Sequence, residues 1–94
     1  MNITRVNIRV LETPGPIKAQ AEIIIEDSFI VRGLTIRENS SGECFVAYPY
    51  RFKDNGGPEK IRVDVAHPLT RPMGNYIEGK VIDAYEEELN RRPH

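Results

Sequence analysis

Asp64 and His67 lie three residues apart and are the side chains best suited to acid–base catalysis in this sequence. Histidine is the commonest general base, and a carboxylate can orient its ring. In an extended segment, however, residues three apart point to opposite faces, and neither a nucleophile nor an oxyanion glycine motif accompanies the pair. Local roles at a strand-to-helix corner, or a phosphate contact by His67, are the competing interpretations. We therefore predict that the protein is not an enzyme.

Metal and cofactor chemistry has equally little support in the sequence. His67 and His94 are the only histidines, and the acidic residues lack the spacing of a calcium loop or a zinc site. Cys44 is the only cysteine, so it cannot form an intrachain disulfide, and we interpret it as a small buried hydrophobic residue. No glycine-rich phosphate-binding motif occurs. We predict no cofactor, no metal and no small-molecule substrate.

The segment from residue 50 to residue 72 mixes cationic and aromatic side chains, which suit contact with nucleic acid. Lys and Arg neutralise phosphates, and aromatic rings stack on bases or sugars. The segment holds five basic and three acidic residues, a charge of +2 in a chain whose net charge is -1. Solvated charges, with Tyr50 or Phe52 packed on the sheet, would explain the same pattern. The candidate nucleic-acid-binding residues are Tyr50, Arg51, Phe52, Lys53, Lys60, Arg62, His67 and Arg71.

The C-terminal segment is unsuited to contact with phosphates. Residues 73–94 contain three basic and five acidic side chains, among them Glu86, Glu87 and Glu88 in succession. Such a cluster repels a phosphate backbone, so nucleic acid should avoid this end of the chain. The acidic residues, or an exposed sheet edge, could instead bind another protein. A partner that stays bound after nuclease treatment would identify this alternative function, a protein-interaction adaptor.

Five short strands are predicted to position these side chains. Apolar residues alternate with polar ones, as in residues 3–10, which is typical of a strand with one buried face. Turn residues separate the strands, for example Pro-Gly-Pro at residues 14–16, and Gly33 should mark a bulge. In residues 50–60, the Gly-Gly-Pro tip favours a loop rather than regular structure. The predicted strands cover residues 2–11, 18–26, 29–37, 43–48 and 61–66.

One amphipathic helix is predicted over residues 73–91. Its apolar residues recur at spacings of three and four, the period of a helix with one buried stripe. The helix could begin at Asn75, with Glu78 as its capping-box partner, or earlier, with Thr70 as its cap and Pro72 in its first turn. The apolar stripe consists of Ile77, Val81, Ile82, Tyr85 and Leu89.

These elements predict one α+β domain over residues 1–94, an antiparallel β-meander sheet of four to five strands with the C-terminal helix on one face. A chain of 94 residues, 39% of them apolar, fits a single small domain. No apolar run is long enough to cross a membrane, and the first residues lack a signal-peptide pattern. We expect a cytoplasmic protein without a membrane partner. Exposed edge strands would favour pairing into a homodimer.

Several strings of residues resemble the SpoVG family, the septation regulators also called stage V sporulation protein G. Residues 6–9, 18–19 and 29–31 are similar to its first three strands. Residues 45–49, Phe-Val-Ala-Tyr-Pro, resemble the family's Phe-Val-Ala-Met-Pro. Residues 64–68, Asp-Val-Ala-His-Pro, resemble its Asp-Ile-Ala-His-Pro signature, which is the most specific of these strings. Together the similarities cover nearly the whole chain.

The resemblance implies a small α+β domain that dimerises through its sheet. It also implies a cytosolic regulator that binds DNA, and in some members RNA, to influence gene expression, including sporulation and septation. In the family a basic pair or triplet follows the proline of the fourth strand, and this feature corresponds to Arg51 and Lys53, with Phe52 between them. The histidine of the signature corresponds to His67.

The chain departs from the family pattern at two places. Tyr48 replaces the usual methionine before the proline. Residues 71–76, Arg-Pro-Met-Gly-Asn-Tyr, stand where the family has a basic and polar run that opens the helix. Fewer cations at the helix opening imply a change in affinity or in target sequence.

Overall fold

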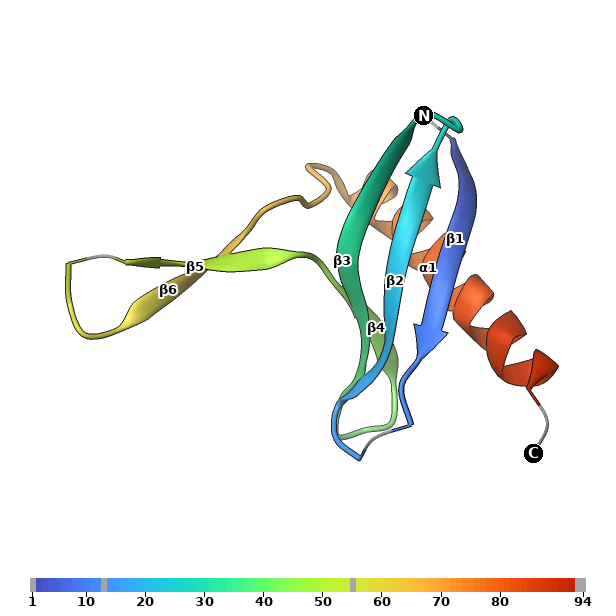
Figure 1. Cartoon of the computed structure of the whole chain (residues 1–94), viewed down its shortest axis with the longest axis horizontal. Coiled ribbons are helices and arrows are strands. Elements are labelled where there is room, and N and C mark those ends of the chain that lie inside the picture. Colours follow the sequence, from blue (N-terminus) through green and yellow to red (C-terminus); the bar gives the residue numbers. More distant parts are fainter. Residues whose placement is uncertain (1, 13, 55, 93–94) are drawn as a thin grey trace.

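The computed structural model describes residues 2–12, 14–54 and 56–92; His94 lies outside them. An antiparallel sheet in the order β1-β2-β3-β4 forms the body of the protein (Figure 1). Neighbours in the sheet are also neighbours in the chain, which confirms the predicted meander. Its strands are β1 (Ile3–Val10), β2 (Ile17–Ile25), β3 (Phe29–Glu38) and β4 (Cys44–Ala47), and the helix is α1 (Arg71–Arg91).

Two further strands, β5 (Tyr50–Asp54) and β6 (Lys60–Asp64), form a second, two-stranded antiparallel sheet. The predicted fifth strand, residues 61–66, therefore exists over nearly the same residues, but outside the meander. The prediction of a loop over most of residues 50–60 was wrong for residues 50–54 and Lys60, which belong to strands, whereas residues 56–59 connect the two strands without regular structure. Residues before and after the Gly-Gly-Pro tip pair in register, with Phe52 opposite Arg62. The tip residues determine only where the chain reverses, whereas aromatic and β-branched side chains on both sides favour strands.

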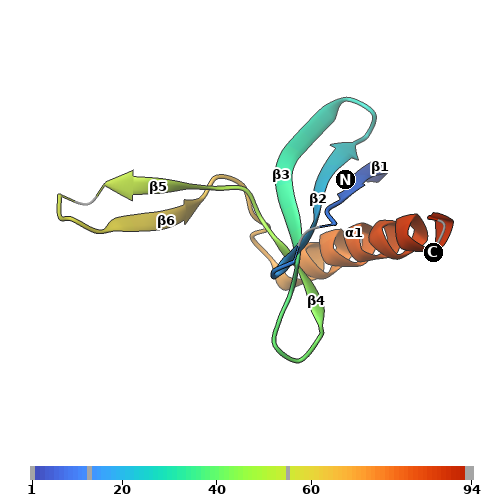
Figure 2. The same ribbon diagram turned by 60° about the horizontal axis from the view of Figure 1, so that its bottom comes forward.

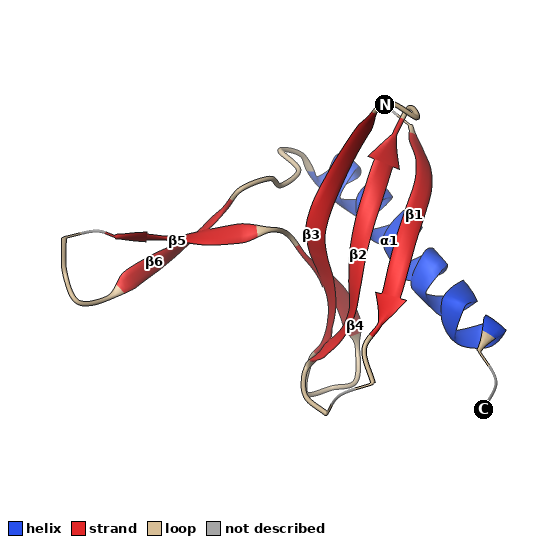
Figure 3. Cartoon of the chain, in the orientation of Figure 1, coloured by secondary structure: helices blue, strands red, loops and turns tan. Residues whose placement is uncertain are grey.

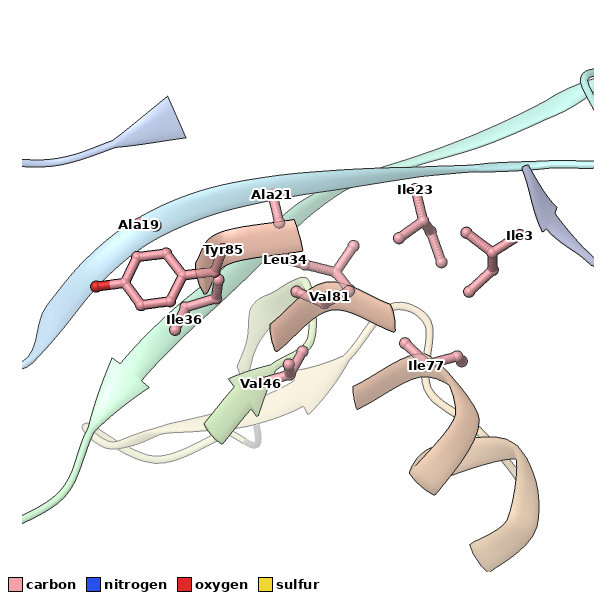
Figure 4. Packing of buried hydrophobic residues seen from close by; sticks show 10 residues of the cluster. All are labelled: Ile3, Ala19, Ala21, Ile23, Leu34, Ile36, Val46, Ile77, Val81 and Tyr85. Carbon is pink, nitrogen blue, oxygen red and sulfur yellow. The ribbon is translucent and has the colours of Figure 1, made fainter. Parts of the chain in front are cut away.

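The helix lies across one face of the four-stranded sheet and leaves the other face open (Figures 2 and 3). Apolar side chains of the sheet and of α1 point toward one another between the two layers (Figure 4). Leu34, Ile36 and Val81 are fully buried there. The alternation predicted from the sequence therefore places one set of strand residues in the core, and the other set, which is mostly polar but includes Ile24, Ile30 and Phe45, on the open face.

The N-terminus of α1 confirms the earlier of the two predicted starts. The Thr70 hydroxyl oxygen accepts a hydrogen bond from the Met73 N–H at 3.3 Å, and Pro72 lies in the first turn. Asn75 and Glu78 lie inside the helix, so the alternative capping box does not form. The predicted apolar stripe faces the sheet, with Ile77, Val81 and Tyr85 buried and Ile82 and Leu89 partly buried against the core. No helix among the described residues is long and apolar enough to cross a membrane.

Gly33 lies at the predicted bulge in β3. Ala21 pairs with Leu34 and Ile23 with Val31, so two residues of β3 stand opposite Glu22 alone. Gly33 has a φ of 88°, a conformation that side chains disfavour, and a Cβ placed on it would lie 3.1 Å from the Pro49 Cβ. The bulge therefore requires glycine for two reasons, backbone conformation and contact.

We expect Gly33→Ala to lower the free energy of unfolding by about 2 kcal/mol, because the left-handed conformation alone costs about 1–2 kcal/mol and Pro49 must also move. Urea denaturation would measure this loss. Gly79→Ala is the matched control, since a Cβ on Gly79 meets nothing within 4 Å. The control should gain up to about 1 kcal/mol from helix propensity. Equal effects of the two substitutions would contradict the assigned role of Gly33.

Candidate nucleic-acid interface

Strands β5 and β6 form a hairpin, residues 50–64, that we call the arm. It projects away from the sheet and the helix (Figure 1). Every residue of β5 is exposed, as is every residue of β6 except Val63. At the root of the arm, the Val65 N–H donates a hydrogen bond to the Pro49 carbonyl oxygen at 2.7 Å. Six of the eight candidate residues lie on this arm: Tyr50, Arg51, Phe52, Lys53, Lys60 and Arg62.

One face of the arm combines aromatic rings with cations. The rings of Tyr50 and Phe52 pack edge to face, with centroids 5.5 Å apart and an interplanar angle of 84°. The guanidinium carbon of Arg62 lies 4.0 Å from the centroid of the Tyr50 ring, a cation–π contact. Lys60 is on the same face, opposite Asp54. Cross-strand contacts therefore hold the aromatic rings of this face in place while leaving them exposed.

The other face of the arm carries the remaining two cations. Arg51 lies opposite Val63, and Lys53 lies opposite Ile61. Because alternate residues of a strand point to opposite faces, Arg51 and Lys53 stand on the side away from Tyr50. The hairpin thus divides the basic and aromatic cluster into a stacking face and a face with two adjacent cations. The two faces exist because β5 and β6 pair as strands. A loop, which was predicted for these residues, has no such faces.

His67 and Arg71 lie in the segment that follows the arm. Arg71 is the first residue of α1 and is exposed. His67 lines a shallow hollow at the root of the arm together with Arg62 and Asp64. The Nδ1 atom of His67 lies 2.9 Å from the carbonyl oxygen of Pro68. Among the described residues, Asp64 and His67 do not hydrogen bond to each other, so the two side chains are not arranged as a catalytic dyad.

The body of the protein offers little for metal or thiol chemistry. Within residues 2–12, 14–54 and 56–92, no three His, Cys, Asp or Glu side chains lie close enough together to hold a metal ion. Cys44 is partly buried against the core, and burial, with the nearby Glu38 carboxylate, raises the pKa of its thiol. The neutral thiol is the less reactive form, which agrees with the interpretation of Cys44 as a packing residue.

The residues that open α1 contribute to packing. The Tyr76 hydroxyl oxygen accepts a hydrogen bond from the Ile3 N–H at 3.0 Å, which joins the helix to β1. Met73 packs against the core. The structure gives a reason why residues 71–76 do not form a basic run. Part of this turn faces the sheet. Apart from the exposed Arg71, cations for nucleic acid have to come from other elements.

The sequence prediction missed a second basic surface, on the open face of the sheet. Arg5, Arg9, Arg32 and Arg37 belong to β1 and β3 and alternate with core residues. The composition of the sequence does not reveal this positive surface, because residues 1–49 as a whole hold five basic and six acidic side chains. The period-two pattern was the available signal, since it places these arginines on one side of the sheet.

The SpoVG family model matches residues 1–87 of the chain. A relative from Exiguobacterium is 41% identical over 85 residues, covering 90% of this chain and 81% of its own length. Relatives from Staphylococcus carnosus and Agathobacter rectalis are 36% and 34% identical, covering 93% and 95% of this chain and 77% and 97% of their own lengths. The names of all three refer to septation and to SpoVG, and to no enzymatic reaction.

Proposed function

The chain belongs to the SpoVG family, and on that basis we propose that it is a homodimeric regulator that binds DNA, and RNA as well, through residues 50–72. The observation that carries this proposal is the arm, which presents four cations and two aromatic rings to solvent. Phosphates need cations gathered where the nucleic-acid backbone passes, and stacking needs accessible rings. Arg51, Lys53, Lys60 and Arg62 would neutralise phosphates, while Tyr50 and Phe52 stack.

The proposed dimer is supported by the unpaired edges of the sheet. Strands β1 and β4 are the outer strands of the order β1-β2-β3-β4. An outer strand presents free N–H and C=O groups to which a second chain can add. A small domain also gains stability from an added interface, and a twofold axis would give the assembly two arms. Through such binding the protein would act in gene expression connected with septation or sporulation, in the cytoplasm.

Removing the two adjacent cations of the arm tests the proposal. We expect Arg51→Ala with Lys53→Ala to weaken binding to duplex and single-stranded oligonucleotides about 100-fold at 0.1 M salt, about one decade for each lost contact. The slope of log affinity against log salt should fall by about two, one for each lost phosphate contact. Fluorescence anisotropy titrations at two salt concentrations would measure both quantities.

The acidic helix provides the control for this experiment. Glu87→Gln removes an exposed charge of α1 and should leave the affinity within about twofold, because the helix faces away from the proposed interface. An affinity of the wild-type protein that does not respond to salt would contradict the proposal. So would a double variant of the arm that binds as tightly as the wild type.

A further inference from the structure

The open face of the four-stranded sheet, opposite α1, carries four arginines and one acidic side chain. Arg5, Arg9, Arg32 and Arg37 alternate with core residues of their strands, and Glu22 occupies the matching position of β2. This arrangement gives the face a charge of +3. Arg5, Arg9 and Arg32 are exposed, and Arg37 is partly exposed. The charge is accessible to a ligand that lies against the sheet.

Hydrogen bonds on this face leave three of the four arginines unneutralised. Glu22 accepts from Arg32 Nε at 3.3 Å and from Asn7 Nδ2 at 2.9 Å, so the acid and Arg32 compensate each other. Arg37 Nε donates to the uncharged Thr35 hydroxyl at 3.4 Å. Within the described part of the chain, Arg5 and Arg9 have no hydrogen bond or ion pair. Arg5, Arg9 and Arg37 are therefore free cations of the open face, and Arg9 and Arg37 lie beside the residues described next.

The groups around these cations suit nucleobases. A shallow hollow of about 580 Å³ lies on the open face and includes Asn7, Gln20 and Thr35 in its lining. Amides and hydroxyls can both donate and accept hydrogen bonds to base edges. Phe45 lies opposite Arg37 in the β3–β4 pairing and keeps 39% of its surface exposed. An exposed aromatic ring on a sheet provides a platform for a stacked base.

We propose that the open face of the sheet is a second nucleic-acid-binding surface, which takes a single strand lying across β1 to β4. Arg9 and Arg37 contact its phosphates, and Phe45 stacks on a base. A duplex would keep its bases paired and away from Phe45. Charge complementarity favours a polyanion over a second copy of the chain, since two open faces brought together would oppose charges of +3 and +3. The choice of nucleic acid rests on the proposed function.

The test compares variants in titrations with a fluorescent single-stranded 20-mer of mixed sequence at two salt concentrations. Arg9→Gln with Arg37→Gln should weaken binding about tenfold or more at 0.1 M salt and lower the salt slope by about 1.4, at 0.7 for each phosphate of a single strand. Phe45→Leu should weaken binding about fivefold or more without changing the slope, because stacking releases no counterions. Far-ultraviolet circular dichroism would verify that each variant is folded.

The matched control removes two cations from the helix side of the protein. Lys80→Gln with Arg91→Gln should leave affinity and slope within error, because both residues belong to α1. Equal losses in this control and in the variant of the open face would overturn the inference, as they would show a response to net charge alone. Wild-type affinity and slope in Arg9→Gln with Arg37→Gln would also overturn it. So would sedimentation showing that these substitutions dissociate a dimer.

The variant Arg51→Ala with Lys53→Ala separates this inference from the proposed function. If the arm variant binds weakly and the variant of the open face binds like the wild type, the inference is wrong and the proposed function stands. If only the variant of the open face binds weakly, the inference stands and the arm is not the interface. If the wild-type protein binds no oligonucleotide, both are wrong.

Discussion

A chain in which the arm, residues 50–64, is replaced by the dipeptide Asn-Gly is expected to keep its fold and to lose affinity for nucleic acid by about 100-fold or more at 0.1 M salt. Four cations leave with the arm, and each phosphate contact contributes about one decade at that salt concentration, offset in part by the three acids that also leave. The salt slope should fall by up to about four. Binding that remains would belong to His67 and Arg71, which stay in the chain, and to the open face of the sheet.

The body should tolerate this replacement because of the backbone at the root of the arm. The Val65 N–H and the Pro49 carbonyl oxygen, 2.7 Å apart, already make the hydrogen bond that closes a two-residue turn, and Asn-Gly is the preferred sequence for such a turn. None of the described arm residues belongs to the core. The free energy of unfolding, measured in urea, should therefore change by less than about 1 kcal/mol. Loss of the cooperative transition would show that the arm is part of the folded unit.

Leu34→Ala is expected to lower the free energy of unfolding by about 3 kcal/mol. Leu34 has no exposed surface, and its side chain lies between the sheet and α1 (Figure 4). Truncation of a buried leucine removes its transfer free energy and leaves a cavity, at a cost of about 2–5 kcal/mol. A domain of this size has about 5–14 kcal/mol in all, so the loss is a large fraction. The midpoint of urea denaturation should fall by about 2 M.

Phe29→Ala provides the comparison, because Phe29 begins the same strand and is 65% exposed. It removes a larger side chain than Leu34→Ala but should cost less than about 1 kcal/mol, since little of the ring leaves water on folding. A cost at Phe29 equal to that at Leu34 would mean that the core is not where the structure places it.

The body of the fold could be predicted from the sequence because its signals are local. Alternation in the strands, the stripe on the helix and the bulge at Gly33 each follow from a few neighbouring residues. The start of α1 remained open because Thr70 and Asn75 can both cap a helix. The structure favours Thr70, since a helix that begins there can donate from Met73 N–H to its hydroxyl and place Pro72 in the first turn.

The candidate site could be predicted in composition but not in arrangement. The basic and aromatic residues between 50 and 72 were identified by type, yet their two faces depend on the pairing of Phe52 with Arg62 across the arm. The open face of the sheet was missed for a similar reason. Arg9 and Arg37 are 28 positions apart in the chain, and only the meander brings β1 and β3 into one surface, each beside β2.

The separation of charge between the two sides of the protein has a consequence for how it meets a polyanion. Helix α1 holds three basic and five acidic residues, whereas the open face has a charge of +3 and the arm has four basic and three acidic residues. A molecule of net charge -1 and isoelectric point near 6.1 thus has an electric dipole. The field of a nucleic acid would turn it during diffusion, so that its basic side arrives first and productive encounters become more frequent. Once bound, it would present its acidic helix outward and give the complex a negative exterior.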